Sequence, residues 1–383
     1  MKYLFFALSL AMAGISPKAH SENAKSVNIS MVKIAEIMSR LLPLTLDKNK
    51  FKEKKLQSPI KNDLDNLSTT FSQVKNHFSK GIVNYKLASG LIDQYIKDAK
   101  LAFTQGHTAY SRKLIQSVGA LCVSCHGQDA KSVKLFHRVD RSHFSSHFDF
   151  AEFNFMTRRW SAALRLYENF INTFNQSKNK DLLLTALKRE IYIYTMILKD
   201  DRALINKLTR HAKNKLFGPL ILERIKNWKA SLEEIEKSPI KGKLSLSKIN
   251  QFTKGLFIGN DSKLFALNGY DNELKFLRLN RLLNDYLKTS PPSKELPRIL
   301  LLLSRCHKAL NFSLYYSLSD QYLKECMTKY PHAPSAKNCY QEYKNNLTNS
   351  FTGSGGTSIP RGLLKELQEY KKKIFSNAKP IKH

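Results

Sequence analysis

Residues 58–78 read SPIKNDLDNLSTTFSQVKNHF and show a regular apolar pattern. The apolar side chains recur in alternating steps of four and three residues, at Ile60, Leu64, Leu67, Phe71, Val74 and Phe78. Such spacing predicts a helix that buries one face along its whole length. It is typical of a helix packed nearly parallel to its neighbours in a bundle. We expect Ser58 to be the N-cap and Pro59 the first helical residue.

Three more helices are predicted around it, over residues 28–126. The first has a stripe that stops at Pro43, and the third extends from about Leu87 to Phe103. The stripe of the first helix consists of Met31, Ile34, Met38, Leu41 and Leu42. The fourth ends in Cys122-Val123-Ser124-Cys125-His126, with Gly127 as the helix stop.

The sequence Cys122-Val123-Ser124-Cys125-His126 has the pattern of covalent c-type haem attachment. Positions i, i+3 and i+4 of a helix share one face. Two thiols on that face reach the two vinyl groups of one porphyrin, and the adjacent imidazole ligates its iron. The motif therefore predicts one covalent haem c held by Cys122, Cys125 and His126.

Three other interpretations of the cysteine pair stay open. A thioredoxin-like redox pair follows a strand and begins a helix, whereas here a helical pattern precedes the motif. A zinc site needs two more ligands, for which His137, His143 and His147 are available. A disulfide between residues three apart on a helix is strained.

A helical segment of about 100 residues that ends in this motif resembles the class II cytochromes c, the cytochrome c-prime group. Residues 118–126 (VGALCVSCH) are similar to that family's final helix. The resemblance implies that Cys122 and Cys125 form thioethers, that His126 is the proximal ligand, and that the first helix lines the distal side. Met31 or Met38 is then a candidate distal ligand, with His77 and His107 as further candidates. The alternative is that both methionines are core residues.

The chain downstream is also predicted to be helical. Residues 147–174 resemble a tetratricopeptide repeat through Trp160, Ala163 and Tyr167, and a looser unit covers residues 300–343. We expect an all-α fold, with a four-helix-bundle haem domain followed by an α-solenoid. The expected divisions are a signal peptide (1–21), the bundle (22–130), a connector (131–146), the repeats (147–345), and a flexible link with a basic helix (346–383).

The N-terminal sequence and the remaining cysteines indicate the cellular compartment of the protein. Lys2 precedes a short apolar run over residues 3–13, the pattern of a cleaved secretory signal peptide. We therefore expect export to a bacterial periplasm, where cysteines pair or carry a cofactor. Cys326 and Cys339 flank the predicted turn at residues 330–334 and are a candidate disulfide, which leaves Cys306 unpaired.

The composition bears on partners. Hydrophobic residues make up 42% of the 383 residues, which argues against global disorder, and 63 basic against 31 acidic residues give a net charge of +32. Such an excess favours an acidic protein partner or an anionic membrane surface. Nucleic acid is the weakest of these candidates because no recognised motif is present. A lysine-rich proteome is the alternative explanation.

Together these features predict a periplasmic mono-haem cytochrome that transfers electrons to or from a partner docked on a helical scaffold. We expect an electron carrier or haem-binding protein rather than an enzyme, because one haem transfers one electron. A second attachment motif is absent, which excludes a di-haem peroxidase. The alternatives are a haem-based gas or redox sensor with an open distal site, and an envelope scaffold whose main role is partner binding.

Overall fold

The structure is a computed structural model that describes residues 17–80, 83–126, 136, 138–175, 179–254, 256, 272–310 and 317–376. Within these residues the chain forms fifteen α-helices, several short 3₁₀ or π turns and one small hairpin. The all-α prediction is therefore confirmed. Residues 1–16 of the predicted signal peptide lie outside this range, and α1 begins at Pro17.

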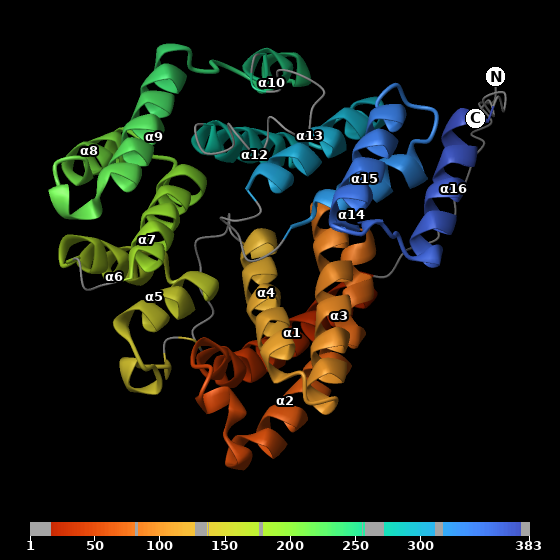
Figure 1. Cartoon of the computed structure of the whole chain (residues 1–383). Helices are drawn as coiled ribbons and strands as arrows, with labels where there is room; N and C mark the ends of the chain where they lie inside the picture. The colour runs from red at the N-terminus through yellow and green to blue at the C-terminus, as the bar shows by residue number, and fades with distance from the viewer. Residues whose placement is uncertain are drawn as a thin grey trace, which may run out of the picture.

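The first four helices pack against one another (Figure 1). They are α1 (Pro17–Leu46), α2 (Lys54–Val74), α3 (Val83–Thr104) and α4 (Thr108–His126), with η1 (Lys50–Lys52) and η2 (Lys75–Lys80) on either side of α2. The predicted stripe of α2 is buried from Ile60 to Val74. Phe51 of η1 closes the end of this core, where its ring meets Phe103 edge to face.

Two predicted helix boundaries are wrong. Helix α1 continues through Pro43 to Leu46, although proline lacks the N–H that would bond the carbonyl of Ser39. That defect costs about 3 kcal/mol. Burial of Leu41 and Leu42, 0% and 1% exposed, contributes about 1.5–3 kcal/mol each and outweighs it. Helix α2 begins at Lys54, four residues before the predicted N-cap Ser58.

The remaining helices follow one another around an arc (Figure 1). They are α5 (His147–Met156), α6 (Trp160–Asn172), α7 (Lys180–Tyr192), α8 (Asp201–His211), α9 (Pro219–Lys237), α10 (Leu246–Phe252), α12 (Glu273–Leu287), α13 (Leu296–Ala309), α14 (Ser319–Lys329) and α15 (Ala336–Ser350). The short turn η4 (Arg141–His143) precedes α5, and η5 (Ile193–Leu198), η6 (Lys215–Phe217) and η7 (Ser293–Glu295) lie between later helices. Most neighbouring helices along the arc pack against each other, and α9 also packs on α12. These contacts bury apolar side chains.

Both ends of the arc contact the first four helices. At one end α5 packs on α1 and α4. Further along, Lys86 of α3 forms an ion pair of 2.8 Å with Glu325 of α14, and Asn84 donates a 2.5 Å hydrogen bond to Asn284 of α12. The end of α4 therefore points toward the inside of the arc (Figure 1).

Three consecutive charged residues tie α7 to three other helices. Lys188 pairs with Glu273 of α12 at 3.1 Å, and Arg189 pairs with Glu152 of α5 at 3.2 Å. The third, Glu190, lies 2.8 Å from the His211 ring of α8. All three acidic side chains are at most 6% exposed, so each pair replaces water around a buried charge.

The C-terminal region differs from the expected flexible link. Strands β1 (Thr352–Gly353) and β2 (Gly356–Thr357) form an antiparallel hairpin, which leads into α16 (Arg361–Phe375). Helix α16 packs on α14 and α15, and its buried residues are Leu367 and Ile374.

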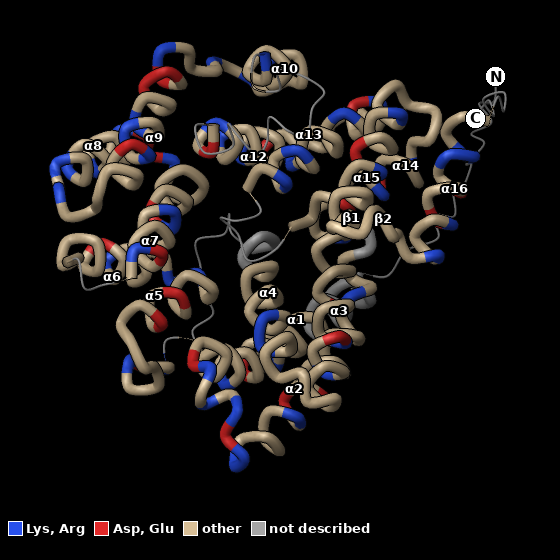
Figure 2. Tube along the Cα trace, in the orientation of Figure 1, with Lys and Arg blue, Asp and Glu red and all other residues tan. Residues whose placement is uncertain are grey.

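Lys and Arg residues occur on helices in all parts of the fold (Figure 2). No helix among the described residues is long and apolar enough to cross a membrane.

Candidate functional site

The attachment motif occupies the C-terminal turns of α4 (Thr108–His126). Its backbone is helical from Cys122 to His126, which places Cys122, Cys125 and His126 on one face of the helix. Cys125 and His126 are described by their backbone alone. The helical spacing on which the haem interpretation depends is therefore present.

A cavity of about 180 Å³ lies between the four helices and reaches Cys122. Every one of them contributes to its wall, together with η2. The lining residues are Met31 and Ile34 of α1, Leu67 and Phe71 of α2, Phe78 of η2, Tyr85, Ser89, Ile92 and Ile96 of α3, and Val118 and Cys122 of α4. This wall is almost wholly apolar.

The polar atoms at this cavity come from few side chains. Ser89 donates its hydroxyl to the carbonyl of Lys86 at 2.9 Å, within α3. Tyr85 adds a phenol to the same side of the wall. Met31 and Cys122 add two sulfur atoms from α1 and α4. The cavity thus offers a thioether and two hydroxyl groups in an apolar setting, the features that decide ligand binding beside a haem iron.

The four candidate distal ligands differ in their position relative to the cavity beside Cys122. Met31 lines the cavity, whereas Met38 is 3% exposed inside the core and is not among the lining residues. His77 is an exposed residue of η2 whose ring packs edge to face on Phe78, at 5.9 Å between centroids. His107 precedes α4, and fifteen residues at 1.5 Å place it about 22 Å along the helix from Cys122. Among these four residues, only Met31 shares a cavity with the attachment motif.

The thiol of Cys122 is not an activated nucleophile. Burial raises the pKa of Cys122 to about 11, although the nearby positive charge of Arg158 opposes this shift. Reactive redox cysteines have lowered pKa values and favour helix N-termini, where the dipole stabilises a thiolate. Cys122 lies at the other end of its helix, and no strand precedes it within the described residues. This environment disfavours the thioredoxin-like interpretation.

Packing from the arc fixes this end of α4. Gly119 lies one turn before Cys122, and a Cβ atom there would come within 2.9 Å of Leu42 Cδ2 and 3.4 Å of Met156 Sδ. Helix α5 therefore packs closely on α4 and α1. The turn after α5 carries Arg158, whose backbone is left-handed at φ 61°. The interaction between Arg158 and Cys122 thus joins the arc to the segment Cys122–His126 at the end of α4.

The residues fit a porphyrin in chemistry. Two cysteines and a histidine at helical spacing would form the donor set, and the adjacent cavity wall is apolar. Pockets that enclose a drug-sized ligand measure about 300–1,000 Å³, so the 180 Å³ cavity accommodates only part of a macrocycle. The cavity wall is partly exposed to solvent at Met31, Tyr85 and Cys122. The part of the macrocycle that does not fit in the cavity would extend toward the solvent there.

Among the described residues, no group of three or more His, Cys, Asp or Glu side chains could hold a metal ion. This part of the structure therefore does not support the zinc interpretation. His143 is exposed, and its Nδ1 atom lies 3.3 Å from Asp140. His147 is also exposed, at the start of α5. His137 lies outside the described residues.

The other predicted cysteine site joins α14 to α15. Cys326 and Cys339 form a disulfide, with their Cα atoms 6.5 Å apart. Cys306 is free and fully buried on α13, as a small hydrophobic residue would be.

Sequence reasoning missed part of the cavity wall. Tyr85, Ser89, Ile92 and Ile96 are spaced by four, three and four residues on α3, so helical periodicity was the available signal. Arg158 had no local signal, because its approach to Cys122 depends on how α5 packs against α4.

Comparison with protein-family models, with curated proteins and with solved structures found no match to this chain.

Proposed function

We propose that this protein is a c-type cytochrome that carries one covalent haem. Cys122 and Cys125 form the thioethers, and His126 is the proximal iron ligand. The observation that carries the proposal is the apolar cavity between α1, α2, α3 and α4, which reaches Cys122. A bound haem would supply one-electron redox chemistry, or a site for a small ligand.

The proposal assigns a role to each part of the chain. Helices α1 to α4 form a haem bundle similar to the class II cytochromes c. The helices from α5 to α15 act as a repeat scaffold of the tetratricopeptide type, on which a protein partner docks. A net charge of +32 favours an acidic redox partner, and an anionic membrane surface is the other candidate. A cleaved N-terminal signal would deliver the protein to the periplasm.

The chain's own residues support electron transfer through the shape of the cavity. Apolar side chains such as Ile92 and Val118 line the cavity, and in the proposed site they would limit the access of water to the attachment side. Met31 is the candidate sixth ligand because it lines the same cavity as Cys122. A thioether ligand favours a low-spin iron suited to electron transfer.

A second candidate function is gas or redox sensing. It is favoured by the cavity of about 180 Å³ beside Cys122, because space there that the macrocycle does not fill could hold a small ligand if Met31 does not bind iron. Tyr85 and Ser89 would then offer hydroxyl groups to the ligand. Reduced protein should show no spectral change with carbon monoxide if Met31 is bound, and a clear change if the position is open. An envelope scaffold without haem chemistry is the remaining alternative.

Absorbance of the purified protein tests the proposal. Wild type from a host with haem-attachment machinery should give the pyridine haemochrome spectrum of haem c. Cys122→Ser/Cys125→Ser should lose covalent haem, whereas Cys306→Ser is a matched control because that free cysteine is buried in α13 and should leave haem content unchanged. Equal haem content in the double variant and the control would refute the proposed attachment.

A further inference from the structure

A second cavity, of about 570 Å³, lies where the chain passes from α9 to α10 and on to α12. This volume falls within the range of ligand-binding pockets. Its wall includes the end of α9, the linker that follows, α10 and the start of α12. None of these residues belongs to the haem site.

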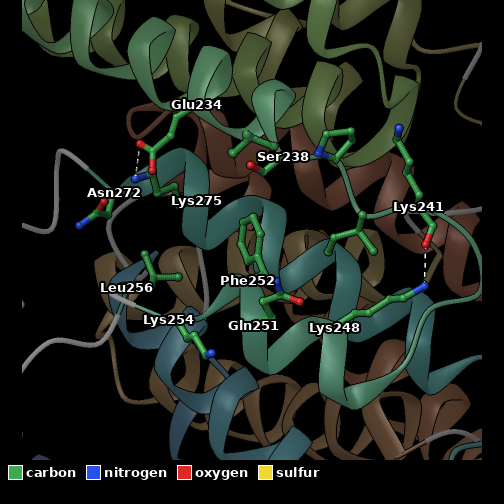
Figure 3. Close-up of a pocket in the computed structure, with 13 residues that line it drawn as sticks. Glu234, Ser238, Lys241, Lys248, Gln251, Phe252, Lys254, Leu256, Asn272 and Lys275 are labelled. Atoms are coloured by element: carbon green, nitrogen blue, oxygen red, sulfur yellow. Dashed lines mark hydrogen bonds and ion pairs between the residues drawn. The ribbon is translucent and has the colours of Figure 1, made fainter.

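Two polar ties hold the walls of this cavity in place. Lys275 of α12 pairs with Glu234 of α9 at 2.6 Å. Lys248 of α10 donates to the carbonyl oxygens of Lys241 and Lys243, at 2.6 and 2.9 Å. Figure 3 shows these ties on opposite sides of the cavity, with Phe252 between them. The cavity is therefore largely preformed.

The hydrogen bonds of Lys248 hold the conformation of the loop between α9 and α10. Gly242 lies between the two carbonyl groups that Lys248 binds, and its φ of +69° suits a residue without a side chain. The lysine therefore fixes a left-handed turn of the backbone. As a result, Lys241 is held beside the cavity rather than on a free linker.

The wall combines an apolar surface with unneutralised positive charge. Ile235, Ile240, Phe252 and Leu256 supply the apolar part. Among the described residues of the wall, Glu234 alone carries a carboxylate, and Lys275 already neutralises it. The side chains of Lys241 and Lys254 are exposed and have no polar partner among the described residues. The charge that these described residues leave without a partner is therefore positive.

We propose that this cavity binds a small organic anion with an apolar body, in particular an amphiphilic carboxylate. Its hydrocarbon part packs on Phe252 and Leu256, and Lys241 and Lys254 attract its charge. An uncharged analogue loses the attraction, and a short carboxylate loses the apolar contact. This binding requires no haem and goes beyond the proposed electron transfer.

Calorimetric titration of the full chain with octanoate tests the proposal, with octanamide and acetate as matched ligands. We expect octanoate to bind at least tenfold more tightly than either, and equally well to wild type and to Cys122→Ser/Cys125→Ser. Failure of haem attachment would thus leave this test intact. Undetectable octanoate binding, or equal affinity for octanamide, would overturn the proposal.

Two variants locate the site. Lys241→Glu/Lys254→Glu changes exposed side chains, so the fold should persist, and it should weaken octanoate binding at least tenfold. Lys371→Glu/Lys372→Glu makes the same charge change on α16 and should leave the affinity within twofold of wild type. Phe252→Ala should weaken octanoate binding about tenfold by removing the central apolar contact. An equal loss in the α16 variant would attribute the binding to overall charge and contradict the site.

Discussion

Replacing Arg189 with methionine leaves the Glu152 carboxylate in the core without its cation. The two side chains are 5% and 3% exposed and make contacts of 3.2 and 3.3 Å. Removing one partner of a buried pair costs about 3–5 kcal/mol, because the other charge stays buried. Tyr167 still donates its hydroxyl to Glu152, so we expect the lower value, about 3 kcal/mol.

Arg189→Met/Glu152→Gln should recover most of this loss. Glutamine carries no charge and keeps an acceptor for the Tyr167 hydroxyl, so neither a buried charge nor an unpaired hydroxyl remains. We expect the double variant to be within about 1–2 kcal/mol of wild type.

Thermal unfolding followed by circular dichroism measures both effects. For a unit of about 150–250 residues, 1 kcal/mol shifts the midpoint by about 2–4 °C, so Arg189→Met should lower it by about 6–12 °C. Lys229→Met is the control. It breaks a pair with Glu233 that is 33% and 45% exposed, and such pairs contribute about 0–1 kcal/mol. An Arg189→Met shift no larger than the control shift, or a double variant as unstable as the single one, would refute the reasoning.

Three further predictions concern other parts of the molecule. Burial lowers the pKa of His307 to about 4, so the unfolded chain, with a pKa of about 6.5, binds this proton more strongly. The free energy of unfolding should therefore fall by about 3 kcal/mol as the pH is lowered from 6.5 toward 4. The urea midpoint of His307→Gln should depend less on pH over this range than that of wild type. An equal dependence on pH in the two proteins would contradict this prediction. Cys326→Ala/Cys339→Ala opens a loop of 13 residues and should lower the free energy of unfolding by about 3 kcal/mol in urea titrations, whereas unaltered stability would count against a native disulfide. Lys86→Glu should destabilise the protein by about 1 kcal/mol in the same assay, and Lys86→Glu/Glu325→Lys should restore it; absence of rescue would argue against this contact between α3 and α14.

Much of the helical architecture could be predicted from apolar periodicity. The stripe from Ile60 to Val74 is the buried face of α2, because burial of a whole face outweighs local preferences. The same reason explains the wrong boundaries. Pro43 and Ser58 carry local stop and start signals, and burial of apolar neighbours such as Leu41, Leu42 and Ile60 outweighs these signals.

The candidate site could be predicted only in part. The motif from Cys122 to His126 is local, so its helical spacing follows from a short stretch of sequence. The cavity wall depends on the register of four helices, and the sequence alone does not give the rotation that brings Tyr85 to Cys122. The hairpin at Thr352–Thr357 was missed because a glycine-rich segment is typical of both a flexible link and a tight turn.

The mass of one tryptic peptide shows whether haem is attached to Cys122 and Cys125. Cleavage after Lys113 and Lys131 releases residues 114–131, which contain Cys122, Cys125 and His126. In protein from a host with haem-attachment machinery, we predict that this peptide is heavier than its amino-acid sequence by the mass of one haem, and that no other peptide is. An unmodified peptide with both thiols free to alkylate, beside a reference cytochrome fully loaded in the same host, would contradict the account.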